Sequence, residues 1–216
     1  MKIIEFAIQL ISGIVIIIGI HKWEQVRDAK LTLILLLQIA SLFTEFISKI
    51  FIAKFNTNVI PYNIYTVAET SIILLLLGSW ANPSYFTKII RSLSAAFILF
   101  WFFECIVLRN WFRGFADYSL LMGGIILLFA NGIYLYRLSN SSYLPLTKNP
   151  RFWIASSFLL YFSVSTIILS TIGMVYSEGQ DVARNLLNIH LYVHIFTSAL
   201  LIKALLCLPK PLTSVQ

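Results

Sequence analysis

Charged side chains are scarce in this chain of 216 residues. They make up 12 % of the sequence, about half the fraction usual in soluble domains. No polar stretch is long enough to form a soluble domain, and none of the six prolines interrupts an apolar run. Hydrophobic residues make up 59 % of the chain. These shortages exclude a conventional soluble enzyme and favour an integral membrane protein.

What the chain has instead is seven apolar runs that cover nearly all of it. They lie at residues 3–20, 31–52, 60–80, 89–108, 117–137, 152–175 and 186–208. A run of roughly 18–25 apolar residues crosses a ~30 Å hydrocarbon core as an α-helix, at ~1.5 Å rise per residue. The runs are continuously apolar rather than alternating, which argues against spanning strands. We therefore predict an all-α protein, a single domain over residues 1–216 that forms a bundle of seven transmembrane helices.

Basic residues predict the orientation of this bundle. Ten of them lie on the side that holds the C-terminus: Lys22, Arg27, Lys30, Lys88, Arg91, Arg137, Lys148, Arg151, Lys203 and Lys210. Six lie on the other side: Lys2, Lys49, Lys54, Arg109, Arg113 and Arg184. Because the cytoplasmic side of membrane proteins is the more basic one, we expect the N-terminus outside and the C-terminus inside, in a bacterial inner membrane.

The same charges indicate which partners to expect. A basic inner face favours anionic lipid headgroups, so membrane lipids are the first expected partners. The charges are scattered through short connections and form no basic domain that could hold a duplex, which argues against nucleic acid. The longest connections are expected around Ser139–Thr147 inside and at Tyr176–Asn185 outside. Cys105 and Cys207 fall near opposite ends of the bundle, too far apart for a disulfide.

Polar side chains inside the apolar runs point to a site. A charged side chain near the bilayer centre costs roughly 2.5–3.5 kcal/mol, so it faces protein or water rather than lipid. Glu45 and Glu69 each lie about eight residues from the outer end of their spans, or ~12 Å, and His190 and His194 lie about four and about eight residues in. We therefore predict an outward-facing polar pocket. Its expected ligand-binding residues are Ser41, Glu45, Asn63, Glu69, His190 and His194.

Simpler roles for these residues remain open. Glu45 and Lys49 are four residues apart and could neutralise each other as a structural pair. Glu69 could be hydrogen-bonded to a neighbouring helix. The two histidines could bond across helices to serine, threonine or tyrosine.

A metal site is the most specific chemical hypothesis. His190-x-x-x-His194 places two imidazoles on one helical face, a spacing that zinc sites use. Glu45 or Glu69 would be the third ligand, and the other carboxylate would act as general base on a bound water. If the protein is an enzyme, these two glutamates are its candidate catalytic residues.

This pattern resembles the seven-helix zinc hydrolases of the alkaline ceramidase and adiponectin receptor superfamily. Ser41-x-x-x-Glu45, Glu69 and His190-x-x-x-His194 follow the order of that family's motifs. The chain departs from them where Glu45 replaces a histidine ligand and Glu69 replaces an aspartate. The resemblance implies a zinc cofactor and a zinc-dependent lipid amidase or esterase.

A second resemblance covers more of the chain. Tyr62-Asn63-Ile64-Tyr65 with Glu69, and Asn149-Pro150-Arg151-Phe152-Trp153-Ile154, look like patterns in uncharacterised bacterial seven-helix membrane proteins. Similar regions precede signalling domains in some membrane sensors. Because only Leu208–Gln216 follows the last run, this resemblance implies that a sensor's output would pass to a partner membrane or signalling subunit.

We favour a non-enzymatic role, in which the polar pocket serves ligand binding, sensing or assembly with a partner membrane protein. The zinc hydrolase is the first alternative. A small-solute carrier is the second, since Asn63 and Asn188 would suit one, although carriers commonly use helices broken by proline or glycine at the midplane.

Overall fold

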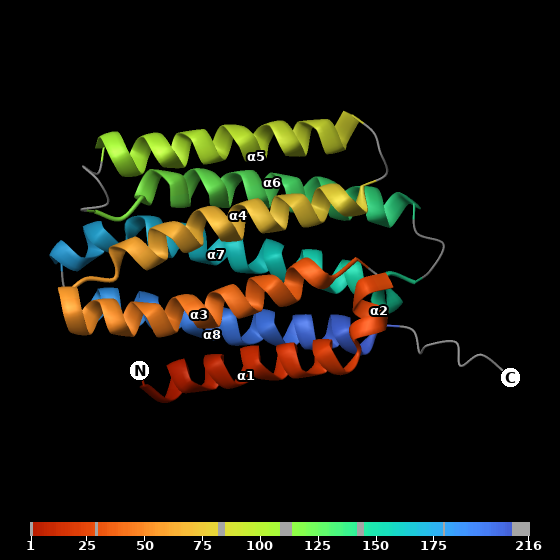
Figure 1. Ribbon diagram of the computed structural model, residues 1–216, viewed down its shortest axis with the longest axis horizontal. Coiled ribbons are helices and arrows are strands. Elements are labelled where there is room, and N and C mark those ends of the chain that lie inside the picture. The colour runs from red at the N-terminus through yellow and green to blue at the C-terminus, as the bar shows by residue number, and fades with distance from the viewer. Residues whose placement is uncertain are drawn as a thin grey trace, which may run out of the picture.

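The computed structural model describes residues 2–28, 30–81, 85–108, 114–141, 145–178 and 180–208, without the side chains of residues 2–5, 28, 172–178 and 180. Throughout these residues the chain is helical apart from short connections. The helices are α1 (Lys2–His21), α2 (Trp23–Asp28), α3 (Thr32–Phe55), α4 (Val59–Trp80), α5 (Tyr85–Phe103), the π-helix η1 (Glu104–Leu108), α6 (Asp117–Ser141), the 3₁₀-helix η2 (Leu146–Lys148), α7 (Pro150–Glu178) and α8 (Gln180–Leu206). Consecutive long helices run antiparallel to one another in one bundle (Figure 1).

Six helices of the described chain are long and apolar enough to cross a membrane. They are α3, α4, α5 with η1, α6, α7 and α8, and each covers one of the predicted runs. The first predicted run forms α1, a helix of 20 residues of which the side chains are described from Phe6 to His21. Large apolar side chains such as Leu99, Phe129 and Ile167 are 65–71 % exposed on the outside of the bundle, where hydrocarbon would cover them. The fold is therefore that of a multi-pass helical membrane protein.

The helix ends differ from the prediction mainly in one connection. The expected outer loop at Tyr176–Asn185 is wrong, because α7 continues to Glu178 and α8 begins at Gln180. This stretch is polar but contains no proline, and glutamate and glutamine are good helix formers, so the helices continue beyond the apolar segments. Among the described prolines, the two that are helical, Pro61 and Pro150, lie in first turns, where no backbone N–H donor is needed.

The helices α1, α3, α4, α6, α7 and α8 form a closed ring, in which each packs against the next and α8 returns to α1. The helix α5 packs outside this ring against α4 and α6, and lies at the edge of the bundle in Figure 1. We call the end where α1 begins the N-terminal end of the bundle, and the end where α8 ends the C-terminal end. The ring places α3 and α4 opposite α8 and α7, so the inner faces of these four helices enclose the centre.

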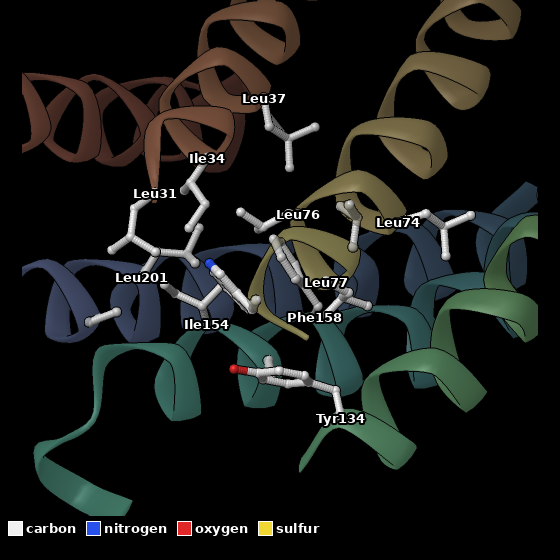
Figure 2. Packing of buried hydrophobic residues seen from close by; sticks show 14 of the residues in the cluster. Leu31, Ile34, Leu37, Leu74, Leu76, Leu77, Tyr134, Ile154, Phe158 and Leu201 are labelled. Carbon is white, nitrogen blue, oxygen red and sulfur yellow. The ribbon is translucent and has the colours of Figure 1, made fainter. Parts of the chain in front are cut away.

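An apolar core fills the part of the ring near the C-terminal end. Its fully buried members include Leu31, Ile34, Leu77, Ile154 and Leu205, none of them more than 1 % exposed. Figure 2 shows how side chains of this core from different helices converge. Lipid tails are as apolar as this core, so the hydrophobic effect does little to drive the helices together. Close van der Waals packing of these side chains stabilises the bundle instead.

Basic residues tie helices together at the same end. Lys22 Nζ donates a 3.0 Å hydrogen bond to the Leu205 carbonyl oxygen, near the end of α8 where the helix dipole favours a cation. The Arg137 guanidinium lies 4.9 Å from the ring centroid of Phe86, and that of Arg151 lies 5.8 Å from the ring of Trp80. The side chains of Lys2, Arg109, Arg113 and Lys210, which were part of the predicted charge balance, lie outside the described residues.

Candidate functional site

Two hollows lie inside the bundle. The first, which we call the C-side hollow, lies between α3, α4, α7 and α8. Its lining consists of Leu37, Gln38, Ser41, Tyr65, Glu69, Ser157, Phe158, Tyr161, His194, Thr197, Ser198 and Leu201. Leu37, Phe158 and Leu201 also belong to the apolar core, so they form the floor of this hollow towards the C-terminal end.

The second, the N-side hollow, lies between α4, α6 and α7. Its lining consists of Thr66, Glu69, Thr70, Leu120, Gly124, Tyr161, Phe162, Ser165, Thr166 and Leu169. Leu120 lies in the first turn of α6, which places this hollow towards the N-terminal end. Glu69 and Tyr161 line both hollows and therefore mark the junction between them.

Glu69 lies in the middle of α4, a helix of 22 residues. Its carboxylate accepts a 3.1 Å hydrogen bond from the hydroxyl of Tyr65, one turn earlier on the same helix. The spacing of four residues places both side chains on one face. No lysine or arginine lines either hollow within the described part of the chain. An ionisable group thus sits at mid-depth in a membrane-spanning helix, where its placement needs a compensating partner.

Tyr161 of α7 contacts both predicted histidines. Its ring centroid lies 5.7 Å from that of His190 and 5.6 Å from that of His194, the latter in an edge-on geometry. Each histidine also has a serine partner: His190 Nδ1 lies 2.9 Å from Ser165 Oγ, and His194 Nδ1 lies 3.4 Å from Ser198 Oγ. These contacts with serine and tyrosine match the simpler alternative for the pair, although Ser198 belongs to the same helix as His194.

Gln38 of α3 is the least expected member of the site. It is 7 % exposed, and its side-chain oxygen has no hydrogen-bond partner among the described residues. A buried amide oxygen left without a donor costs about 1–3 kcal/mol. Because Gln38 lines the C-side hollow, that hollow contains an acceptor with no donor.

Glu45 does not join the centre. It accepts a 2.6 Å hydrogen bond from Gln9 Nε2 of α1, and it lines neither hollow. In the described chain it forms no ion pair with Lys49, whose side chain is exposed. Ser41, Glu69 and His194 share the C-side hollow, and His190 approaches the N-side hollow through Ser165. The expected single centre of two glutamates and two histidines is not what the helices assemble.

Asn63 ties α4 to the segment before α6. Its side-chain amide donates to the Gly114 carbonyl oxygen at 3.0 Å and accepts from the Ala116 N–H at 2.9 Å. Its own backbone carbonyl oxygen accepts a 2.8 Å hydrogen bond from Trp101 Nε1. Asn63 is 1 % exposed and lines neither hollow. Its contacts are therefore those of a structural residue, not of a pocket residue.

Glu104 is a second buried carboxylate, and its hydrogen-bond partners give it a structural role. It is fully buried, and its oxygens accept hydrogen bonds from the backbone N–H groups of Tyr118 and Ser119 at 3.0 and 2.6 Å. These groups belong to the first turn of α6, where a negative charge is favoured by the helix dipole. The sequence places Glu104 only near the outer end of its run and gives no signal for this capping role.

The residues do not fit the zinc site that the resemblance implies. No group of three or more histidine, cysteine, aspartate or glutamate side chains in the described chain could hold a metal ion. Glu45 is bonded to α1, and both imidazoles carry serine and tyrosine contacts. Two imidazoles without a third protein ligand fall short of a catalytic zinc site.

Three side chains of the centre were not among the predicted site residues. Helical spacing places Gln38 on one stripe with Ser41, three residues later, and Tyr65 on one face with Glu69, four residues later, but neither was assigned to the pocket. Tyr161 lies in an apolar stretch of α7 with no such signal, and only the packing of α7 on α8 brings it to the histidines.

The size of the hollows limits what they can hold. Each has a volume of about 30 Å³, enough for roughly two water molecules at ~10–15 Å³ each. The C-side hollow combines a carboxylate, an unpartnered amide oxygen, serine and threonine hydroxyls and two tyrosine rings. Such a lining suits a small polar species.

Comparison with the models of known protein families, with curated proteins and with solved structures found no match. The class of the protein therefore rests on its own helices: it is a multi-pass helical membrane protein with a polar centre at mid-depth.

Proposed function

We propose that this protein binds a small polar ligand at the polar centre around Glu69, and that this binding serves sensing or assembly with a partner membrane subunit rather than catalysis. The membrane is a bacterial inner membrane. The chain crosses it seven times, with the N-terminus outside and the C-terminus inside.

The position of Glu69 is the observation that carries the proposal. The residue lies in the middle of α4, lines both hollows and has no lysine or arginine beside it among the described lining residues. Burying a polar or charged group in a membrane is costly, and such groups commonly mark ligand or ion sites. A carboxylate with a purely structural role would have a full set of donors, as Glu104 of η1 has in the backbone N–H groups of Tyr118 and Ser119.

Charge and packing support the orientation and the seventh span. Described basic residues gather at the C-terminal end of the bundle, where Lys22, Arg137 and Arg151 bind backbone or aromatic groups. The more basic side of a membrane protein is cytoplasmic. The helix α1 has 20 residues and packs against α3 and α8 as a member of the ring. It therefore fits as a span of the same bundle.

One observation favours the carrier as a second candidate. Glu69 and Tyr161 separate a hollow towards the N-terminal end from one towards the C-terminal end. A central residue reached alternately from two sides is what carriers require. Uptake of radiolabelled sodium or methylammonium into sealed vesicles that contain the protein, lost in Glu69→Gln, would favour this candidate over simple binding.

Ligand-dependent thermal stability tests the proposal. Purified protein in detergent is heated in the presence of sodium, potassium, ammonium, formate or formamide, each small enough for the hollows. A ligand that binds only the folded protein raises Tm with its concentration. We expect at least one probe to do so in the wild type and in Glu45→Gln, which lies outside both hollows, and to have no effect on Glu69→Gln.

Two outcomes of this thermal-stability experiment would contradict the proposed binding at Glu69. A probe that raises Tm equally in the wild type and in Glu69→Gln would show that any binding occurs elsewhere. Absence of a response to every probe in the folded wild-type protein would refute the proposal.

A further inference from the structure

The C-side hollow contains the acceptor groups of Glu69 and Gln38, and only Glu69 has a donor among the described residues. Glu69 and Gln38 contribute a carboxylate and an amide oxygen. The Tyr65 hydroxyl donates to Glu69, and the Ser157 hydroxyl is engaged with the carbonyl oxygen of Thr197 at 2.9 Å. The oxygen of Gln38 is left without a donor among the described residues.

The charge of the residues that line this hollow also favours a cation. Glu69 brings a carboxylate to mid-depth, and the described lining contains no lysine or arginine to balance it. The histidine of this lining, His194, has its Nδ1 atom 3.4 Å from Ser198 Oγ. Lys22 and Arg151 are engaged at the C-terminal end, beyond the apolar floor of Leu37, Phe158 and Leu201. A ligand that brings a positive charge would satisfy both oxygens at once.

The size and composition of the hollow select among cations. A volume of about 30 Å³ holds an ion with one water or none, at ~10–15 Å³ per water-sized body. Calcium takes about 6–8 oxygen ligands and magnesium retains several waters, whereas this hollow offers one carboxylate and little room for water. Tyr65 and Tyr161 also line this hollow, and aromatic rings attract monovalent cations.

We infer that the C-side hollow binds a small monovalent cation, a metal ion or ammonium, between the Glu69 carboxylate and the Gln38 side-chain oxygen. This inference rests on the proposed ligand-binding function and names the ligand class of the same site. It assigns to Gln38 the role of a second binding residue, on α3, which packs directly against the α4 helix that carries Glu69.

The test is a set of cation titrations followed by thermal unfolding in detergent. Sodium, potassium and ammonium chloride are each compared with N-methyl-D-glucamine chloride, whose cation is too large for the hollow, at equal ionic strength. We expect at least one of the three small cations to raise the Tm of the wild type along a saturating curve that yields an apparent Kd. The response of the three cations distinguishes a metal ion from ammonium.

Variants of Gln38 provide the decisive readout. Gln38→Leu removes a buried amide whose oxygen has no partner among the described residues, so the protein should fold at least as well as the wild type. Its apparent Kd for the cation should rise at least tenfold. Gln38→Glu adds a second carboxylate and should shift the preference towards calcium. The matched control is Gln25→Leu, because Gln25 in α2 also has an unpartnered side-chain oxygen but lies outside both hollows; its Kd should equal that of the wild type.

Three results would contradict the inferred cation site. An unchanged Kd in Gln38→Leu would overturn the role of Gln38 and with it the inferred site. Stabilisation by formamide or formate, with none by the small cations, would overturn the cation while leaving the proposed ligand-binding function intact. No response to any probe would overturn both.

Discussion

Gln9 on α1 donates a 2.6 Å hydrogen bond to the carboxylate of Glu45 on α3. This bond joins two neighbouring helices of the ring and accounts for a glutamate inside an apolar run without reference to a ligand. It also separates two acidic residues of similar depth: Glu45 belongs to a helix contact, whereas Glu69 belongs to the polar centre.

Removing the donor of this bond should therefore destabilise the bundle. Gln9→Leu leaves Glu45 without its partner and should lower the free energy of unfolding by about 1–3 kcal/mol. The double variant Gln9→Leu/Glu45→Leu removes both polar groups and should recover most of that loss. Denaturant unfolding in detergent micelles, followed by tryptophan fluorescence, measures both effects.

The matched control for this prediction is Lys49→Leu. Lys49 is exposed and forms no ion pair with Glu45 in the described structure, so the change should stay within ~0.5 kcal/mol. A loss as large as that of Gln9→Leu would indicate that the charge pair between Glu45 and Lys49 is the more important contact.

Asn63 should be more important for stability than for the polar centre. Asn63→Ala removes the side-chain hydrogen bonds to Gly114 and Ala116 and leaves both partner groups unsatisfied, which should cost about 2–4 kcal/mol. Asn188→Ala on α8 is the control, because Asn188 is half-buried and makes no side-chain hydrogen bond with a described residue. Its unfolding free energy should be close to that of the wild type. Equal losses in the two variants would contradict the structural role of Asn63.

Close packing of α6 on α7 depends on Gly124. A Cβ atom at this position would clash with the side chain of Thr166, which lines the N-side hollow with it. We expect Gly124→Ala to destabilise the protein by about 1–3 kcal/mol through overpacking. Gly132 lies on the same helix, and a Cβ there would meet no atom within 4 Å, so Gly132→Ala should be neutral within ~0.5 kcal/mol. A thermal or denaturant midpoint that falls equally in both variants would argue for a general requirement for glycine in α6 instead.

The direction of insertion can be tested by side-specific labelling. In a background with Cys105 and Cys207 replaced by serine, Arg184→Cys should react with a membrane-impermeant maleimide in intact spheroplasts, because Arg184 is 64 % exposed at the N-terminal end. Lys148→Cys, exposed at the C-terminal end, should react only after permeabilisation. The opposite pattern would reverse the orientation.

A tag at the N-terminus extends the same experiment to α1. If α1 crosses the membrane, the tag should be accessible on the side where the Arg184→Cys variant is labelled. Accessibility only on the side where Lys148→Cys is labelled would mean that α1 does not cross.

Much of the fold follows from the sequence. Apolar runs of membrane-spanning length predict helices because a backbone in hydrocarbon must satisfy its own hydrogen bonds, and each of the predicted runs is helical in the structure. The predicted loop at Tyr176–Asn185 is wrong, because α7 continues to Glu178 and α8 begins at Gln180 despite the polarity of this stretch. Beyond the ends of the membrane core, polarity no longer separates helix from loop.

The sequence predicted only some of the residues of the candidate site. Helical spacing and burial cost identified Ser41, Glu69 and His194, which share the C-side hollow. The same reasoning could not exclude Glu45 or Asn63, because a polar residue at a given depth can face either a hollow or a neighbouring helix. Tyr161 entered the site only with the structure.

The sequence by itself determined that this is a helical membrane protein, because the length and hydropathy of each run are local properties of the chain. It also determined that several polar groups lie at mid-depth, where they cannot all face lipid. Which of those groups meet was decided by tertiary structure. The closed ring of six helices turns Glu69 and Tyr161 towards a shared junction and turns Glu45 towards Gln9. The rotation of each helix about its axis depends on all of its neighbours at once, and no single segment of sequence encodes it.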